Sequence, residues 1–266
     1  MSDPRGYPTF DTSVAHIARV YNYLLGGKDN YEADRKAGDA AIEAYPHTVS
    51  SVRANRAFLT RAVRFLAGEA GIRQFLDIGT GIPTAGNTHE VAQSVAPQAR
   101  VVYVDYDPIV LAHARALMTS HPDGATDYLD ADLRDTAKIL EQAAATLDFT
   151  QPVALMLIGI LHFVGDEDQP YDIVSRLLGA VPPGSYLAIS HMASDLSAAQ
   201  VAAAKARLDQ MMYQQGYYRT EAEVARFFDG LELVEPGVVP IQKWRPDSEM
   251  EAQRAAVLWG GIGRKG

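Results

Sequence analysis

Two short segments combine glycines and a carboxylate in a spacing that suits the binding of a nucleoside. Residues 75–84 (FLDIGTGIPT) place Gly79 and Gly81 directly after an apolar run, and residues 101–105 (VVYVD) end a second apolar run on Asp105. Glycine lets the backbone turn sharply and approach a ligand closely, because it has no Cβ. A carboxylate at the tip of the next strand can accept hydrogen bonds from ribose hydroxyls. We therefore expect a site for an adenine nucleoside cofactor.

The same loop departs from the pattern of a dinucleotide site. A pyrophosphate-binding turn has three glycines, as G-x-G-x-x-G, and an acidic residue about 20 residues farther on. Thr84 stands at the third glycine position, and Pro83 has no backbone N–H to donate. Binding of a pyrophosphate is therefore disfavoured, whereas S-adenosylmethionine has no phosphate and can bond its amino acid end to such a turn. A nicotinamide-dependent oxidoreductase remains the less favoured alternative.

Residues 75–84 resemble motif I of the class I S-adenosylmethionine-dependent methyltransferases, and Asp105 resembles their ribose-binding acidic residue. Residues 16–30 (HIARVYNYLLGGKDN) and 79–91 (GTGIPTAGNTHEV) are similar to one branch, the actinobacterial S-adenosyl methyltransferase family long known only as a domain of unknown function. The likeness covers nearly the whole chain, since it continues through two C-terminal stretches, residues 226–231 (RFFDGL) and 259–265 (WGGIGRK).

The resemblance implies S-adenosyl-L-methionine as cofactor and a role for each matching residue. The methionine moiety is expected at Gly79, Thr80 and Gly81, the ribose at Asp105, the adenine ring beside Tyr106 and its edge at Asp132 and the backbone N–H of Leu133. Without the resemblance, Asp130 and Asp132 could equally well cap a helix that begins near Thr136. Gly159, after a later strand, is expected to let the chain pass close to the cofactor.

The order of the segments predicts a doubly wound α/β sheet, a Rossmann-like fold. Five apolar segments indicate strands separated by helical segments: residues 74–78, 101–105, 128–130, 153–158 and 186–190. Such alternation gives parallel βαβ units with right-handed crossovers. Two more strands, around residues 233–240 and 256–262, would make the sheet seven-stranded, mostly parallel, with helices on both faces. The resemblance implies that these last two form an antiparallel hairpin at one edge.

Helical segments precede and follow the predicted sheet. Residues 11–25 have helical spacing and stop at a glycine pair, and residues 49–67 form a second helical stretch. Asp107 followed by Pro108 marks a helix start, with an N-cap acceptor before a proline at the first helical position. Farther on, residues 198–214 form a long alanine-rich helix and residues 220–228 a shorter one. We expect one methyltransferase domain over residues 1–266, in which residues 1–70 cap a core of residues 71–266 and roof the cofactor.

Three groups of residues outside the cofactor loop could act on an acceptor. His162 follows the fourth predicted strand and suits a general base near neutral pH, although a hydrogen-bonded structural histidine is the more common case. Tyr21 and Asn22 are candidates for a lid that lines the cavity, against the alternative of a packing helix. Tyr213 and Tyr217 could wall the acceptor pocket, but core packing is their ordinary role.

Composition narrows the classes of function. The net charge of −9 disfavours a protein whose main task is binding nucleic acid, because phosphates require a basic face. The longest apolar run, residues 153–164, is too short for a transmembrane helix, which needs about 20 residues. The sequence has no cysteine, and its histidines show no paired spacing, so no metal is expected. The N-terminus lacks a secretory pattern, from which we expect a cytoplasmic location.

Taken together, these features predict an S-adenosylmethionine-dependent methyltransferase with a small-molecule acceptor. A binding protein that senses S-adenosylmethionine or S-adenosylhomocysteine without catalysis would keep every cofactor residue. It would differ in lacking an acceptor pocket beside Gly159 and His162. The sequence does not name the acceptor, because fold and cofactor loop do not encode it.

Overall fold

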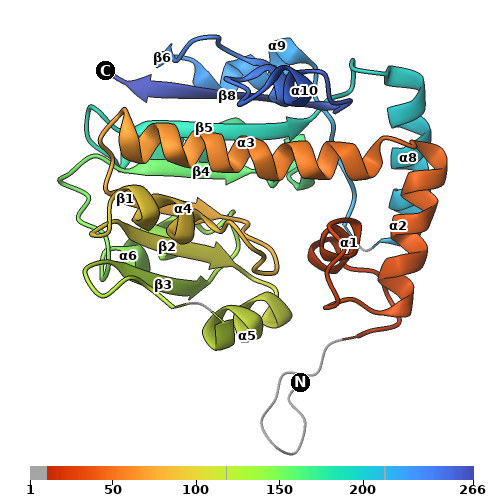
Figure 1. Ribbon diagram of the computed structural model, residues 1–266, viewed down its shortest axis with the longest axis horizontal. Helices are drawn as coiled ribbons and strands as arrows, with labels where there is room; N and C mark the ends of the chain where they lie inside the picture. Colours follow the sequence, from red (N-terminus) through yellow and green to blue (C-terminus); the bar gives the residue numbers. More distant parts are fainter. Residues whose placement is uncertain (1–10, 118, 213) are drawn as a thin grey trace, which may run out of the picture.

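The computed structural model describes residues 11–117, 119–212 and 214–266. Within these ranges one sheet runs through the molecule, and its strands are β1 (Gln74–Ile78), β2 (Arg100–Asp105), β3 (Ala125–Asp130), β4 (Ala154–Ile158), β5 (Tyr186–Met192), β6 (Leu231–Leu233), β7 (Val239–Pro240) and β8 (Leu258–Lys265). Their order is β3-β2-β1-β4-β5-β8-β6 (Figure 1). Strand β7 pairs with β8 beside this path. Strands β1 to β5 are parallel, and β8 is antiparallel to each of its neighbours. The predicted mostly parallel sheet is confirmed.

The described residues form eight strands, so the prediction of seven is wrong in number. The segment expected as one strand around residues 233–240 is split into β6 and β7. Pro236 has no N–H for the sheet, and Gly237 turns the chain at φ 87° while its N–H donates to the Val234 carbonyl at 2.9 Å. Both short strands still pair antiparallel with β8, at the edge where the hairpin was expected.

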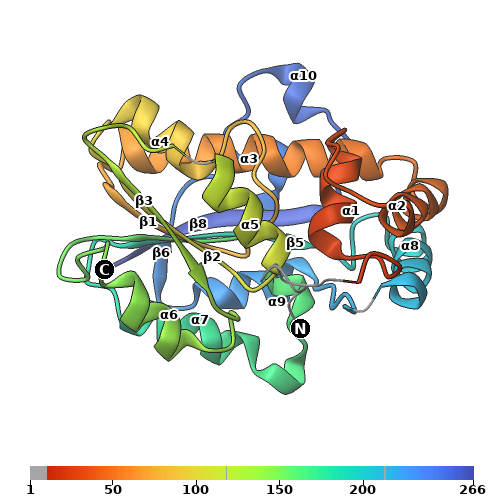
Figure 2. The same ribbon diagram turned by 90° about the horizontal axis from the view of Figure 1, so that it is seen from below.

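Helices cover both faces of the sheet and one of its ends. They are α1 (Ile17–Leu24), α2 (Glu32–Ala44), α3 (Thr48–Gly68), α4 (Thr88–Val95), α5 (Pro108–Leu117), α6 (Thr136–Ala143), α7 (Pro170–Gly179), α8 (Ala198–Met211), α9 (Glu221–Ala225) and α10 (Glu249–Ala252). Figure 2 shows α3 and α4 on one face and α6 and α7 on the other. At the end toward which β1 to β5 point, α1, α2 and α8 stand together, and we call these three helices the end wall (Figure 1).

The core consists of two layers that follow from the alternation of side chains along each strand. Phe75, Val101 and Met156 pack toward α3 and α4, and their sequence neighbours Leu76 and Val102 pack toward α6 and α7. Every residue of β1 and of β4 is buried, as expected for central parallel strands covered on both faces. The buried sheet therefore fixes the positions of the loops at its carboxyl ends.

The first helix begins later than its sequence pattern predicts, at residue 17 rather than 11. Arg19 donates to the carbonyls of Val14 at 2.5 Å and of Asp11 at 3.4 Å, and Ala15 forms a parallel bridge with Met212. These contacts hold residues 11–16 outside a helix and join them to the chain that leaves α8. The N-terminal segment is thus tied directly to the end wall.

Helix α2 was not predicted, and it is joined to α1 by a buried ion pair. Arg19 and Asp34 lie 3.0 Å apart, and both side chains are almost inaccessible to solvent. The Asp34 carboxylate also accepts from the backbone N–H groups of His16 at 2.9 Å and Tyr31 at 2.8 Å. A buried charge is tolerated only when it is paired and hydrogen-bonded, so this carboxylate fixes how the two helices meet.

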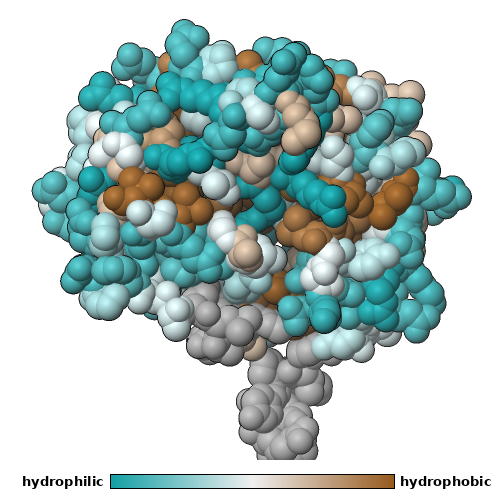
Figure 3. Space-filling model, in the orientation of Figure 1, coloured by the Kyte–Doolittle hydropathy of each residue, from teal (hydrophilic) through white to brown (hydrophobic). Residues whose placement is uncertain are grey.

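The second predicted helix, α3, belongs as much to the sheet as to the N-terminal region. Its residues Ala54, Phe58 and Leu66 are buried in the core layer that also contains Phe75. The division of the chain at residue 70 into a cap and a core therefore stays a prediction. Among the described residues, no helix is long and apolar enough to cross a membrane. Hydrophilic side chains cover most of the face in Figure 3, and hydrophobic ones gather in two areas on either side of its centre.

Candidate active site

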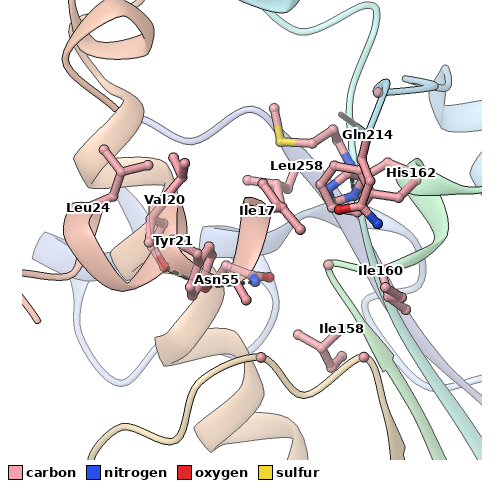
Figure 4. Close-up of a pocket in the computed structure, with 18 of the residues that line it drawn as sticks. Ile17, Val20, Tyr21, Leu24, Asn55, Ile158, Ile160, His162, Gln214 and Leu258 are labelled. Atoms are coloured by element: carbon pink, nitrogen blue, oxygen red, sulfur yellow. Dashed lines mark hydrogen bonds between the residues drawn. The ribbon is translucent and has the colours of Figure 1, made fainter. Parts of the chain in front are cut away.

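A cavity lies between the carboxyl ends of the parallel strands and the end wall. Figure 4 shows side chains that line it from several directions. They come from α1 (Ile17, Val20, Tyr21 and Leu24), from α3 (Asn55), from the end of β4 and the loop after it (Ile158, Ile160 and His162), from residue 214 (Gln214) and from β8 (Leu258). The cavity thus brings together segments that are distant in the sequence.

The floor of the cavity is formed where β1 and β4 end side by side. Each strand is followed by a glycine in the left-handed region, Gly79 at φ 79° and Gly159 at φ 73°. A Cβ at Gly79 would lie 2.5 Å from the side chain of Ile160, so no other residue fits there without displacing this loop. A Cβ at Gly159 would come 3.2 Å from Asn55 Nδ2. Both predicted glycines line the cavity.

The rest of the glycine turn also borders the cavity. Gly81 has φ 65°, and a Cβ built on it would meet no atom within 4 Å, because it would project into open space. Thr80 Oγ1 shares a hydrogen bond of 2.7 Å with the hydroxyl of Tyr128, which stacks on Tyr103 at a ring distance of 5.3 Å. The turn therefore rests on β2 and β3 and leaves its open side toward the cavity.

Asp105, at the carboxyl end of β2, is held by two backbone donors. Its Oδ2 accepts from Gly81 N–H at 2.9 Å and its Oδ1 from Asp107 N–H at 3.0 Å. A carboxylate offers about four acceptor positions, so each oxygen keeps one for a ligand hydroxyl. Burial raises the pKa of Asp105 above its ordinary value. Tyr106 follows it, 40% exposed and on the cavity wall, where Gln214 Nε2 donates to its hydroxyl.

His16 connects the start of α1 to the same strand end. Its Nδ1 lies 2.8 Å from Asp107 Oδ2. Burial alone would raise the pKa of Asp107, but the hydrogen bond and charge of His16 hold it below its ordinary value. The Oδ1 of Asp107 accepts from Ile109 N–H at 2.8 Å and caps α5, the helix start predicted from the Asp-Pro pair. The cavity is therefore closed by α1 beside Asp105.

Asp77 is a buried carboxyl group on the cavity wall that was not predicted from the sequence as a site residue. It lies within β1 and accepts from Thr88 Oγ1 at 2.5 Å. Burial raises its pKa to about 6, against the opposing effects of Thr88 and of the positive charge of Arg56. Arg56 also lines the cavity and donates to the carbonyls of Ala85 and Gly86. The signal in the sequence was a carboxylate inside an otherwise apolar strand.

His162 lines the cavity after β4, as predicted, and it is buried. Its Nδ1 accepts from Met192 N–H at 3.4 Å. Burial, together with nearby His191 and Arg219, holds its pKa well below its ordinary value, so the ring is neutral near pH 7. With Nδ1 as an acceptor, the neutral ring carries its proton on Nε2. In this state His162 offers the cavity a hydrogen-bond donor.

A buried arginine fixes the loop that carries His162. Arg219 donates to the carbonyls of Leu161 at 3.3 Å and Val164 at 3.1 Å, and it contacts His191 Nε2 at 2.9 Å. Its other partner is Asp166 Oδ1, at 2.7 Å. Burial lowers the pKa of His191 to about 3, which keeps that ring neutral as an acceptor for the guanidinium. Neither residue lines the cavity, so they act by positioning the loop.

Of the two lid candidates, Tyr21 reaches the cavity and Asn22 does not. The Tyr21 hydroxyl donates to the Val52 carbonyl at 3.3 Å and accepts from Asn55 Nδ2 at 3.1 Å, and Ser190 Oγ donates to Asn55 Oδ1 at 2.6 Å. Asn22 is buried, and its Oδ1 accepts from Asp29 N–H and from Asn30 Nδ2, both at 3.0 Å. Asn22 thus shapes the turn after α1.

Several other predicted site residues lie away from the cavity wall. Asp132 accepts from Arg134 N–H at 2.8 Å and pairs with its guanidinium, and Leu133 is buried in the core layer of α6 and α7. The cap of α6 is Asp135, so the alternative role as a cap fits neither Asp130 nor Asp132. Tyr217 donates to Glu167 at 2.9 Å outside the cavity, whereas its neighbour Tyr218 lines it. Tyr213 lies outside the described residues.

Comparison with known proteins decides the family. A protein-family model described as S-adenosyl methyltransferase matches residues 5–266. The chain belongs to this family. A crystal structure of a DUF574 family protein from Streptomyces avermitilis is 49% identical, with a TM-score of 0.93 over 96% of this chain and 99% of that one. A proposed methyltransferase from Thermobifida fusca is 45% identical, with a TM-score of 0.88 over 96% of each chain. The resemblance stated from the sequence is confirmed.

Distant structures share the fold. The plantazolicin methyltransferase BpumL, solved with a triazolic desmethylPZN analog and S-adenosylhomocysteine, has a TM-score of 0.52 at 14% identity and covers 93% of this chain and 95% of that one. The search of curated proteins gives no match. The family makes this protein a methyltransferase with S-adenosyl-L-methionine as its cofactor, which removes the nicotinamide alternative.

The residues at the strand ends fit this cofactor. The open side of Gly81 leaves room for a ligand against the turn, and Asp105 keeps acceptor positions for ribose hydroxyls. Tyr106 offers a partly exposed ring beside that carboxylate, where an adenine can stack. Pro83 also lines the cavity, and its missing N–H agrees with a ligand that has no pyrophosphate.

The raised pKa of Asp77 predicts a pH-dependent stability. Between its ordinary value of 3.8 and about 6, the folded protein keeps a proton that the unfolded chain has lost, so stability falls as pH rises. Replacing Asp77 with Asn removes this decrease in stability with rising pH. The free energy of unfolding of Asp77→Asn, relative to wild type, should therefore increase by about 2–3 kcal/mol from pH 4 to pH 7 in urea titrations. An equal difference between the two proteins at both pH values would contradict the shift.

Proposed function

We propose that this methyltransferase acts on a small-molecule acceptor held in the same cavity as the cofactor. The observation that carries the proposal is the extent of the cavity. It reaches from Asp105 and Gly81, past Gly159 and His162, to the end wall at α8. The cavity wall thus extends past the residues that would hold the cofactor, to segments that a protein which only senses the cofactor would not need.

The cofactor would supply a methyl group on a positively charged sulfur: the bond from sulfur to methyl would break as the acceptor atom bonds to the methyl, sulfur would keep the electron pair, and a proton on the acceptor atom would pass to water. The protein has to orient the two ligands and bring the reacting atoms to about 3 Å. In our proposal Asp105 holds the ribose, Tyr106 stacks on the adenine, and the turn from Gly79 to Gly81 receives the methionine moiety. Asp77 and Arg56 would face the ammonium and carboxylate of that moiety, because they are the charged pair beside the turn.

His162 has the geometry to orient the acceptor through Nε2–H. A hydrogen bond from this group to an acceptor oxygen or nitrogen aims a lone pair without adding charge. Action as a general base would need the opposite tautomer and would break the bond from Met192 N–H. Because burial depresses its pKa, the ring also stays neutral near pH 7. We therefore favour an orienting donor over the base expected from the sequence.

The cofactor site is tested by calorimetric titration with S-adenosylmethionine, S-adenosylhomocysteine and NAD. Asp105→Ala should lower the affinity for S-adenosylmethionine and for S-adenosylhomocysteine by more than about tenfold, because hydrogen bonds to a charged group are lost. The matched control is Asp130→Ala, an exposed carboxylate at the end of the neighbouring strand, which should change affinity by less than about twofold. Binding of NAD alone, or equal binding by both variants, would contradict the assignment.

The acceptor class is tested by release of S-adenosylhomocysteine from wild-type protein supplied with S-adenosylmethionine and fractionated cell extract. The low-molecular-mass fraction should support release, and the macromolecular fraction should not. We expect this result because the cavity that reaches Gly159 is bounded by the end wall and would enclose a small acceptor beside the cofactor. Release that depends only on the protein or nucleic acid fraction would refute the small-molecule proposal.

The role of His162 is tested by nitrogen NMR of the imidazole rings, with His162→Gln for assignment. The ring should remain neutral at pH values well below its ordinary pKa near 6.5, with its proton on Nε2. A proton on Nδ1 of His162, or protonation near pH 6.5, would argue for a base instead.

A further inference from the structure

We propose that the acceptor is an uncharged, largely apolar molecule that binds in a chamber on the inner side of the end wall, and that Ala204 sets the depth of this chamber. The inference rests on the proposed function. The chamber is the part of the cavity lined by Leu24, Ala41, Val201, Ala204, Leu208 and Met212. These residues belong to the helices of the end wall or directly follow them, whereas the cofactor turn follows β1. A molecule in the chamber can therefore present one end toward the cofactor.

Helix α8 turns an apolar stripe toward the chamber. Val201, Ala204 and Leu208 are spaced by three and four residues and so share one face of the helix. Ala204 and Leu208 stay only half-buried although they face inward, while Ala203 on the outer face is exposed. The protein thus leaves apolar surface uncovered inside the cavity, and burying such surface favours binding of an apolar ligand.

Charged groups that line the cavity are either at the cofactor end or already paired. Asp77, Arg56 and Asp105 stand around the glycine turn. Asp209, at the other end, pairs with Lys205 and accepts from Gly216 N–H at 3.1 Å. Among the described residues, the chamber therefore presents no unpaired charge to a ligand. A charged acceptor would lose its hydration there without a counter-ion, which is strongly unfavourable.

Ser51 gives an independent sign that the cavity is built to hold a ligand. Its side chain, on α3, is 4% exposed and lines the cavity, and its Oγ has no hydrogen-bond partner within the described part of the chain. A buried hydroxyl without a partner is costly, so such a group is expected to bond to a ligand. A single hydroxyl or amide on an otherwise apolar acceptor would satisfy it.

Asn55 lies at the junction between the chamber and the cofactor end. It is bonded on one side to Tyr21 and on the other to Ser190, and a Cβ on Gly159 would lie 3.2 Å from its Nδ2. Figure 4 shows Tyr21 and Asn55 joined by a dashed line, with Ile17, Val20 and Leu24 of α1 nearby. The junction is therefore rigid, and the apolar side chains of α1 continue the wall toward the end of the chamber.

The test uses full-length protein saturated with S-adenosylhomocysteine and two probes that differ by one charge, 1-naphthol and 4-hydroxynaphthalene-1-sulfonate. Calorimetry should give a dissociation constant of about 0.1 to 1 mM for 1-naphthol, as expected for a molecule of this size. The dissociation constant of the sulfonate should be at least about tenfold higher. Ala204→Trp should lower the affinity for 1-naphthol more than about tenfold, because the indole ring would fill the chamber. The matched control, Ala203→Trp on the exposed face of the same helix, should bind it as wild type does.

A second pair of variants tests Ser51. Ser51→Ala should lower the affinity for 1-naphthol about three- to tenfold through loss of one hydrogen bond. Ser50 does not line the cavity, so Ser50→Ala should leave this affinity unchanged. All four variants should keep the affinity for S-adenosylhomocysteine within about twofold of wild type, which shows that they are folded.

The inference is overturned if the sulfonate binds as well as 1-naphthol, if Ala204→Trp binds 1-naphthol normally, or if 1-naphthol fails to bind while S-adenosylhomocysteine does. A wild-type protein that does not bind S-adenosylhomocysteine overturns the proposed function itself. The two failures are therefore distinguishable in the same titrations.

Discussion

The site depends on the reversal of strand order at the middle of the sheet. From β1 the chain builds outward through β2 and β3, and it then returns to place β4 and β5 on the other side of β1. The connections leave the two central strands in opposite directions, so a crevice stays open at their carboxyl ends. Gly79 and Gly159 end these strands in the left-handed region, which keeps side chains out of the crevice. Asp105 ends β2 and His162 follows β4, and both face the crevice because these two strands flank β1 on either side.

A crevice at the end of an open sheet has to be closed before it can exclude water, and the end wall does this. The Arg19–Asp34 pair sets the angle between α1 and α2, and His16 reaches from α1 to Asp107 beside the cofactor end. Removing either member of a buried pair leaves a charge without compensation, so the arrangement is tightly specified. Much of the segment of residues 16–30, including Asn22, builds this closure, and Tyr21 is the candidate from it that lines the cavity.

The fold could be predicted wherever local patterns and burial agree. The central strands were found because each is a short apolar run followed by a turn, and α5 was found because Asp107 and Pro108 form a helix start. The split between β6 and β7 was missed, although Pro236 and Gly237 were visible signals for it. Helix α2 was missed too, despite its alanines, because its buried face is defined by contacts with α1 and α8.

The residues of the site likewise divide into those placed by the local sequence pattern and those placed by tertiary contacts. Gly79, Gly81 and Asp105 are adjacent to strand ends, so their place in the sequence fixes their place in the sheet. Arg19 pairing with Asp34, Arg219 with His191 and Asn55 with Ser190 are tertiary contacts that no spacing encodes. The acceptor chamber depends on tertiary contacts too, since Ala204 lines the cavity only because α8 lies opposite α1 and α2.

The most direct test of this account is a crystal structure of the protein with S-adenosylhomocysteine. We expect the ribose hydroxyls on Asp105, the adenine against Tyr106, the sulfur near Gly159, and the chamber below α8 still open beside it. A nucleoside bound elsewhere, or one whose own atoms fill the space along Val201, Ala204 and Leu208, would contradict a site built for two ligands at the reversal of the sheet.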